Sequence, residues 1–364
     1  MSSTLRYGVI GAGMMGVEHI NNVLHLDGAT VTAISDPNAK SRDRAQLAVG
    51  MDTALHRFES HHDLLASGLC DAVVIASPNH THHQVLLDVL RTPHHVMTEK
   101  PLCTTVADCL DVVALADRHA AEWPQRVVWM GLEYRYMAPT MAVMEEVRAG
   151  TVGRVHMVAI REHRYPFLVK VDNWNRFTRN TGGTLVEKCC HFFDLMNLLV
   201  GTAPLRVMAS GGQSVNHLDE LYDGEQPDIL DNAYVIVEYE GGARGMLDLC
   251  MFAEATKNEQ EISVVGDGGK VEALVTEGIV RVGRRADGIG RVGERILGHG
   301  DGPYAGFHHG SSYLEHVAFR DAISGGLPAA VTLQDGLMSV AVGVAAHRSI
   351  DEGRRIDIAE VLQQ

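Results

Sequence analysis

The chain has 364 residues, which is too long for one typical hydrophobic core and predicts two domains. Hydrophobic residues make up 46% of the chain and charged residues 21%, which is the composition of an ordinary globular protein. The net charge of −15 repels phosphate backbones and anionic lipids, so we expect no nucleic-acid partner and no membrane partner.

The cysteines predict neither a disulfide framework nor a zinc site, because no two of them have C-x-x-C spacing. Thiols in this pattern are typical of a reducing compartment, and we expect a cytoplasmic protein. No apolar run approaches the ~18 residues that a membrane-spanning helix needs. The six cysteines are Cys70, Cys103, Cys109, Cys189, Cys190 and Cys250.

The first element is an apolar run over residues 7–10, which predicts a buried parallel strand. Gly11, Gly13 and Gly16 follow it in G-x-G-x-x-G spacing, and a helical pattern begins at once. The first glycine allows a tight turn, the second lets the backbone approach a pyrophosphate, and the third lets the helix pack close to the strand. The N-terminus of that helix offers N–H groups to phosphates. The alternative is an ordinary strand–turn–helix unit.

A second apolar strand over residues 30–34 leads to Asp36, about 20 residues beyond the last glycine, where an acid binds the ribose hydroxyl of NAD. Pro37 follows in place of a basic residue, which favours NAD over NADP. Arg42 and Arg44 lie near enough to weaken that preference.

Strands and helices alternate up to about residue 130, which indicates βαβ units. We therefore predict an N-terminal Rossmann domain over 1–130, an α/β fold with a doubly wound parallel sheet. Ligands bind at the carboxyl ends of such strands, where Gly11, Asp36, Pro78 and Lys100 fall. The remaining elements are predicted as a helix over 39–49, a strand over 71–76, a helix over 85–90, a strand over 96–99, a helix over 106–115 and a strand over 127–130.

Beyond residue 130, strands follow one another with short glycine-containing turns, which predicts an α+β domain over 131–364 with a mostly antiparallel or mixed open sheet. The glycine-rich segment 286–310 has no periodicity and is predicted as a long surface loop. The expected strands cover 155–162, 207–211, 233–239, 245–252, 261–265 and 279–282, and closing helices cover 313–323 and 333–349.

Two stretches carry the more specific signal. The first is Glu99-Lys100-Pro101, and the second is the pattern G-G-x-L-x-(acid)-x-x-x-H-x-x-D from Gly182 to Asp194. With the opening glycines they resemble the glucose–fructose oxidoreductase/inositol dehydrogenase (Gfo/Idh/MocA) family of two-domain NAD(P) enzymes. The resemblance covers essentially the whole chain, and residues 348–354 also resemble the C-terminal end of that family.

The resemblance implies that Lys100 and His191 handle the proton of a substrate hydroxyl, since two cations that meet there tune each other's pKa toward neutrality. Glu187 lies four residues before His191, so both project from one helix face. The family usually has aspartate at that position. The alternative roles are structural: a solvated cap for Lys100, a core histidine for His191, and a partner of that histidine for Glu187.

The stretch 134–136 resembles a family segment that lines the substrate cleft, so Tyr136 is a further candidate acid or base. Alternatively, this side chain packs at a domain interface. Lys188 is unusual for the family, and Arg164, Arg176 and Arg179 precede it. Cations near a pocket favour an anionic substrate, although solvated loop charges explain them equally well.

The predicted cofactor site and substrate site share Lys100. We expect no metal site, because the histidine pairs share no spacing with acids or cysteines and adjacent helix residues face different ways. The predicted NAD-binding residues are Gly11, Gly13, Met14, Met15, Gly16, Asp36, Ser77, Pro78, Asn79, His82, Glu99 and Lys100. The predicted substrate-binding residues are Lys100, Tyr136, Arg164, Arg179, Glu187, Lys188 and His191, of which Lys100, Tyr136, Glu187 and His191 are the candidate catalytic residues.

The resemblance implies an NAD-dependent enzyme that transfers a hydride between the nicotinamide and a ring carbon of a sugar, polyol or glycoside. A first alternative is a redox-neutral NAD-dependent glycosidase, which some relatives are, and a second is a non-catalytic dinucleotide sensor. The substrate is expected to be a small carbohydrate. A sheet face of this kind is commonly buried by a second subunit, so we also expect a homo-oligomer.

Overall fold

The computed structural model describes residues 4–298 and 302–363. The chain divides into two compact units, which are Met1–Glu133 with Asp301–Leu337, and Tyr134–Gly300 with Met338–Gln364. The predicted boundary at residue 130 lies close to the first division. The segment 301–337 belongs to the first unit, where α10 packs against α1, and no feature of the sequence had predicted that return of the chain.

The first unit contains a six-stranded sheet in the order β3-β2-β1-β4-β5-β6, and all of its strand pairs are parallel. This is the predicted doubly wound sheet, with one strand more than predicted. The additional strand, β3, is only three residues long, which is too short to produce a recognisable apolar run. The strands are β1 (Leu5–Ile10), β2 (Ala29–Ser35), β3 (His56–Phe58), β4 (Ala72–Ile75), β5 (His95–Glu99) and β6 (Val128–Gly131).

The helices of this unit pack in two groups, with α1 against α2 and α10, and α4 against α3 and α5. Their ends follow local capping rules. Asn38 caps α2 by accepting the N–H groups of Lys40 and Ser41, and Thr105 caps α5 through the N–H of Asp108. The helices are α1 (Met14–Leu24), α2 (Ala39–Val49), α3 (His61–Ala66), η1 (Asn79–Thr81), α4 (His82–Val89), α5 (Val106–His119) and α10 (Ser311–Gly325), and α11 (Leu333–Glu352) begins here and continues into the second unit.

The second unit contains a nine-stranded sheet in the order β14-β13-β12-β11-β7-β10-β9-β8-β15. Within the described part of the chain, only β7 and β10 of this sheet pair in parallel, and the other neighbours are antiparallel, so the predicted mixed sheet is confirmed. The strands are β7 (Val155–His163), β8 (Pro204–Gly212), β9 (Asn232–Tyr239), β10 (Arg244–Cys250), β11 (Gln260–Gly266), β12 (Gly269–Leu274), β13 (Ile279–Arg284), β14 (Gly293–Ile296) and β15 (Ile356–Asp357).

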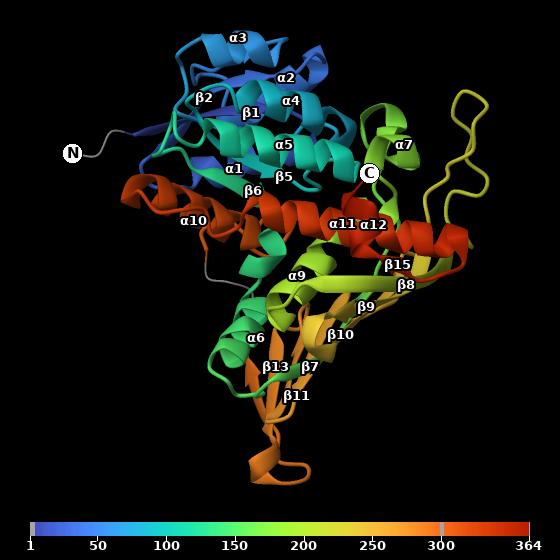
Figure 1. The fold of residues 1–364 in the computed structure, drawn as a ribbon. Helices are drawn as coiled ribbons and strands as arrows, with labels where there is room; N and C mark the ends of the chain where they lie inside the picture. The colour runs from blue at the N-terminus through green and yellow to red at the C-terminus, as the bar shows by residue number, and fades with distance from the viewer. Residues whose placement is uncertain (1–3, 299–301, 364) are drawn as a thin grey trace. The chain divides into compact units, whose positions relative to one another are not determined.

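Helices of the second unit cover one face of this sheet: α6 packs on β12 and β13, and α9 packs on β7 (Figure 1). The segment predicted as a surface loop, 286–310, contains β14 and the end of η5 (Arg285–Asp287), and its residues 299–301 lie outside the described part of the chain. The other helices are η2 (Glu133–Tyr136), α6 (Ala138–Arg148), η3 (Val171–Arg176), α7 (Thr178–Thr181), α8 (Thr184–Glu187), α9 (Cys190–Val200), η4 (Glu240–Gly242) and α12 (Ile358–Leu362).

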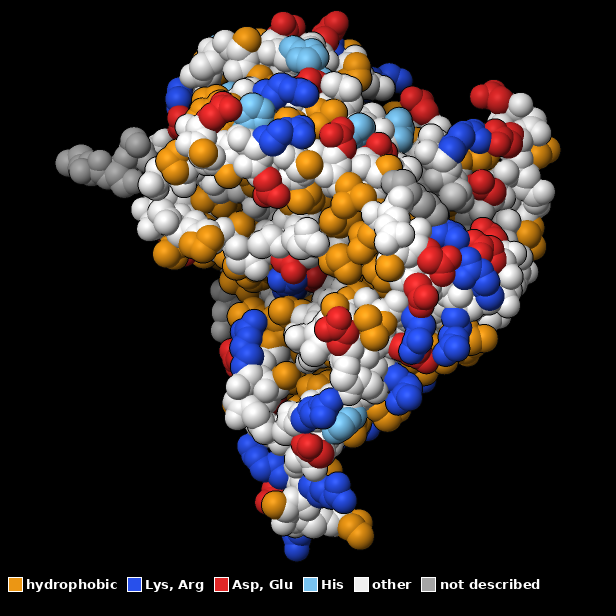
Figure 2. Space-filling model, viewed as in Figure 1, with side chains coloured by type: hydrophobic (Ala, Val, Ile, Leu, Met, Phe, Trp, Pro, Cys, Tyr) orange, Lys and Arg blue, Asp and Glu red, His pale blue; other side chains and the backbone are white. Residues whose placement is uncertain are grey.

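The surface and the thiols agree with the composition. Acidic and basic side chains are intermixed over the face shown in Figure 2. All six cysteines are free, and five of them are buried. Among the described residues, no helix combines the length and the apolar character that crossing a membrane requires.

Candidate functional site

In the turn after β1, a side chain would clash with the protein at two of the three glycines and would meet empty space at the third. A Cβ on Gly11, whose φ is +90°, would lie 2.5 Å from the backbone nitrogen of Ser77, and a Cβ on Gly16 would lie 2.0 Å from the oxygen of Gly11. A Cβ on Gly13 would meet no atom within 4 Å. The first and third glycines are therefore required by the fold itself, whereas Gly13 leaves space in front of the N-terminus of α1, where a pyrophosphate fits.

Asp36 follows β2 at the same edge of the sheet, and its carboxylate is oriented by two backbone groups. Oδ2 accepts the N–H of Ala12 at 2.8 Å, and Oδ1 accepts the N–H of Asn38 at 2.8 Å. A carboxylate has about four lone-pair sites, so it can still accept a ribose hydroxyl. Arg42 donates to the backbone oxygen of Asp36 and is ion-paired with Glu59, so its charge is already matched.

The turn after β4 contains a buried polar atom that fits a ligand. Asn79 is 6% exposed, and its Nδ2 has no hydrogen-bond acceptor among the described residues. His82 contacts the protein instead: its Nδ1 lies 2.8 Å from the oxygen of Pro101, and its Nε2 lies 3.0 Å from the oxygen of Ser77. Because both ring nitrogens face backbone carbonyls, His82 joins the two turns, and its role in cofactor binding stays a prediction.

Glu99 and Lys100 stand where β5 ends, at the sheet edge that also carries the glycine turn. The carboxylate of Glu99 is buried, and both of its oxygens are engaged: Oε1 with His19 at 2.9 Å and Oε2 with the N–H of Lys100 at 3.1 Å. Burial by itself would raise the pKa of Glu99, but the hydrogen bond and charge of His19, together with the charges of Lys100 and His308, outweigh it and lower that pKa to about 2. Glu99 therefore supports Lys100 from within the protein, and its contact with the cofactor stays a prediction. His19 was not predicted from the sequence, although it falls on the buried face of α1 with Ile20 and Val23.

The second unit places Glu187 at the end of α8 and His191 in the first turn of α9. Both side chains are buried, at 5% and 2% exposure. Gly183, which precedes them, is required by packing, because a Cβ on it would lie 2.4 Å from Nε2 of His347. The same nitrogen accepts the N–H of Leu185 at 3.1 Å, so α11 fixes the turn from which α8 begins.

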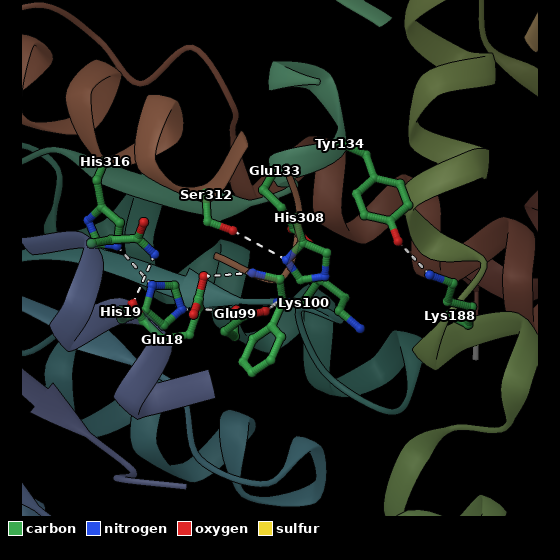
Figure 3. A network of polar contacts seen from close by, with 12 residues as sticks. Glu18, His19, Glu99, Lys100, Glu133, Tyr134, Lys188, His308, Ser312 and His316 are labelled. Carbon is green, nitrogen blue, oxygen red and sulfur yellow. Dashed lines mark hydrogen bonds and ion pairs between the residues drawn. The ribbon is translucent and has the colours of Figure 1, made fainter. Parts of the chain in front are cut away.

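Lys188 and Tyr134 form a polar contact (Figure 3). The Nζ of Lys188 donates to the hydroxyl of Tyr134 at 2.5 Å and lies 3.1 Å from Oε1 of Glu162. The rings of Tyr134 and His191 stack, with centroids 4.0 Å apart and planes at 10°. Tyr136, the tyrosine singled out from the sequence, is half-buried at the end of η2, and its role as an acid or base stays a prediction.

The arginines predicted to attract an anion have acidic partners within the protein. Arg164 lies 3.4 Å from Glu162, and Arg176 lies 3.0 Å from Glu220. Arg179 is ion-paired with Glu225 at the exposed surface. The sequence left open whether these cations serve acidic partners or an anionic ligand; each has an acidic partner, and a contact with an anionic substrate stays a prediction.

A further ion pair joins two elements of the second unit. Arg135 forms a bidentate ion pair with Asp194, which anchors η2 to α9 and explains the last acid of the 182–194 pattern.

On the first unit, one ligand atom each from His61, His62 and Asp88 lie within 4.8 Å of one another, so adjacent histidines do face one acid. Asp88 also accepts hydrogen bonds from Gln84 and lies 3.8 Å from Arg91, so its charge is balanced by protein groups. The expected lack of a metal stays a prediction.

Comparisons with known proteins agree on one family. The oxidoreductase family described as having an NAD-binding Rossmann fold matches residues 5–123, and its C-terminal alpha/beta domain matches residues 144–358. A myo-inositol 2-dehydrogenase of Thermotoga maritima is 29% identical over 98% of this chain and 100% of its own length. A 2,7-anhydro-N-acetylneuraminate hydratase of Mediterraneibacter gnavus is 24% identical over 74% of this chain and 70% of its length.

A solved structure shares the fold of the whole chain. Levoglucosan dehydrogenase in complex with NADH and levoglucosan superposes with a TM-score of 0.83 at 19% identity, covering 97% of this chain and 99% of the other. The open space at Gly13 and the orphaned amide of Asn79 fit the dinucleotide that the family description names. The chain belongs to the Gfo/Idh/MocA family of NAD-binding oxidoreductases.

Proposed function

We propose that the protein is an NAD-dependent dehydrogenase that oxidises a ring hydroxyl of a small polyol or sugar. The observation that carries the proposal is the position of Lys100, an amine held at the end of β5 on the same sheet edge as the Gly11–Gly13 turn. The myo-inositol 2-dehydrogenase name of a relative that matches the chain end to end supports the substrate class.

The cofactor, when bound, supplies the hydride acceptor, and the chain supplies orientation and proton transfer. Gly13 and the N-terminus of α1 bind the pyrophosphate, and Asp36 accepts a ribose hydroxyl. Lys100 and His191 take the proton from the substrate hydroxyl, which contributes typically 10²–10⁴-fold to the rate of such a step. Glu187 and Tyr136 remain candidate substrate ligands.

A redox-neutral reaction on a glycoside or anhydro-sugar is the second candidate. The hydratase among the relatives supports it, because water is added to a sugar with no net change in oxidation state. The same lysine and histidine serve both reactions, so these residues cannot distinguish them.

The test is incubation of the protein and NAD with a panel of neutral polyols, neutral sugars, anionic sugars and their glycosides. A dehydrogenase accumulates NADH in proportion to the product formed. Conversion of substrate without NADH supports the redox-neutral reaction, and NAD binding with no conversion of any compound supports the dinucleotide sensor.

A homo-oligomer formed through the open sheet face is part of the proposal. Met208, Ile236 and Met246 are directly opposite one another on β8, β9 and β10, and they are 53%, 46% and 41% exposed. Tyr234 extends this apolar row along β9 at 64% exposure. A self-complementary face of this kind suits a second copy related by a two-fold axis. Light scattering of Ile236→Glu beside the unmodified protein tests it, and equal masses would contradict it.

The free cysteines support a cytoplasmic location.

A further inference from the structure

A buried chain of three ionisable side chains ends at the residue before Lys100 (Figure 3). His316 on α10 lies with its Nε2 2.8 Å from Nδ1 of His19 on α1, and Nε2 of His19 lies 2.9 Å from Oε1 of Glu99. The other oxygen of Glu99 accepts the backbone N–H of Lys100 at 3.1 Å. Each of these three side chains is at most 7% exposed as a residue, so water does not compete for these hydrogen bonds.

Among these three side chains, the donor and the acceptor are fixed at the contact between His19 and Glu99. An ionised carboxylate only accepts hydrogen bonds, so Nε2 of His19 must carry a proton and donate it to Glu99. The contact between His19 and His316 holds a single proton, and the buried Nδ1 of His316 has no partner among the described residues. Burial lowers the pKa of His316 well below its ordinary value, so this histidine is neutral and serves as a polar support for His19.

The neighbouring carboxylates are bound by other groups. Glu18 is bound by the hydroxyl of Tyr304 and the N–H of Phe307, and Glu315 by the indole N–H of Trp129. Burial raises the pKa of Glu315 well above its ordinary value. Glu133 lies 3.6 Å from His308. Glu99 accepts a side-chain hydrogen bond from His19.

We propose that His19, supported by His316, is a positioning residue for Lys100: it holds Glu99 as an oriented carboxylate, and Glu99 fixes the backbone at which Lys100 leaves β5. The inference rests on the proposed function for the role of Lys100. Replacing a buried ion pair by apolar residues is often neutral or stabilising, so stability alone gives little reason for this chain of groups. A displacement of about 1 Å at a reacting group can cost about 10²-fold in rate, which gives the chain a functional reason.

The geometry supplies a matched pair of variants. The terminal amide of His19→Gln lies near the position of Nε2 and can still donate to Glu99. The amide of His19→Asn lies near Nδ1, so it can contact His316 but does not reach Glu99. Both variants place an uncharged amide in the same buried site, so a purely structural role predicts similar behaviour for the two.

The test measures two quantities in the full-length protein: hydrogen exchange at the Lys100 amide, by NMR or by fragmentation mass spectrometry, and kcat and KM with the best polyol of the panel. We expect His19→Gln to stay close to the unmodified protein in both. We expect His19→Asn to lose exchange protection at Lys100 and to lose about 10- to 100-fold in kcat, with KM and NAD affinity little changed.

Equal exchange at Lys100 in the Asn variant and the unmodified protein would overturn the inference, as would equal turnover in the two amide variants. Exchange needs no substrate, so it decides the positioning contact even if no polyol is oxidised. Unmodified protein that turns over no compound of the panel contradicts the proposed function instead.

Discussion

The ammonium nitrogen of Lys188 lies 2.5 Å from the hydroxyl oxygen of Tyr134, and the ring of Tyr134 is stacked on the ring of His191. Glu162 holds the same ammonium at 3.1 Å. The carboxylate on β7 is thereby connected through Lys188 and Tyr134 to the histidine on α9. Lys188, which the sequence suggested as a contact for an anionic substrate, binds the tyrosine whose ring stacks on His191.

Because Lys188 contacts His191 through Tyr134, we expect Tyr134→Phe and Lys188→Met to lower kcat in the same way, by loosening the orientation of His191. The phenylalanine keeps the stacked ring but removes the hydroxyl that Lys188 binds, so we expect kcat to fall by about 10-fold as His191 loses its fixed orientation. Lys188→Met should lower kcat for neutral and anionic substrates alike, and the double variant should be no worse than Lys188→Met alone.

Steady-state kinetics on a matched neutral and anionic sugar checks this prediction. Lys188→Met removes the nearer of two cations that contact the buried Glu162 carboxylate and leaves it with Arg164, so Lys188→Met with Glu162→Gln serves as the control for lost stability. A rise in KM confined to the anionic sugar would show that the ammonium contacts the substrate and does not serve His191.

Gly13→Val is expected to abolish NAD binding without unfolding the protein. The fold leaves the Cβ position of Gly13 empty, so the branched side chain meets only the space that the pyrophosphate needs. Calorimetry should show an affinity loss of ~100-fold or more, while the thermal midpoint changes little. Gly16→Ala is the contrasting control, because its Cβ would lie 2.0 Å from the oxygen of Gly11 and must disturb the turn. Undiminished NAD affinity in Gly13→Val would remove the basis for this cofactor site.

Asp36 predicts the choice of cofactor. A 2′-phosphate beside this carboxylate would place like charges together, so we expect NAD to bind at least ~10-fold more tightly than NADP. Asp36→Ala should reduce the preference for NAD over NADP by weakening the binding of NAD. Binding titrations with both dinucleotides check this, and tighter binding of NADP to the unmodified protein would contradict the assignment.

His347 predicts part of the pH dependence of stability. Burial lowers the pKa of His347 from 6.5 to about 4, so between those values the unfolded chain takes up a proton that the folded protein does not. The stability that neutral His347 contributes is complete above pH 6.5. As the pH falls toward 4, the free energy of unfolding decreases by on the order of 3 kcal/mol through this residue. His347→Gln keeps an acceptor for the N–H of Leu185 and cannot titrate. Chemical unfolding across this range should show a shallower loss in the variant, and identical slopes would contradict the prediction.

The sequence predicted those features whose signals are local. The helix over 39–49 was placed at its observed bounds, because Asn38 and Gly50 mark its ends. The glycine turn and the parallel strands around it follow from short apolar runs. The strand β12 was missed because it follows β11 after a two-residue turn, and β14 because it lies in a glycine-rich stretch.

The parts of the site that were missed depend on contacts between distant segments. No local pattern links Glu162 to Lys188, or His19 to Glu99 and His316, since each of these residues lies on a different element. The stacking of Tyr134 on His191 was not predicted for the same reason, and Tyr136 stays a candidate acid or base.

The most direct test of the central claim is the rate of NADH formation when the protein saturated with NAD is mixed with a polyol, compared among the unmodified protein, Lys100→Ala and His191→Ala. We predict that each variant forms NADH at least ~100-fold more slowly while binding NAD with nearly unchanged affinity. A variant that keeps most of the rate would show that its residue is structural and would contradict the assignment of proton transfer to this pair.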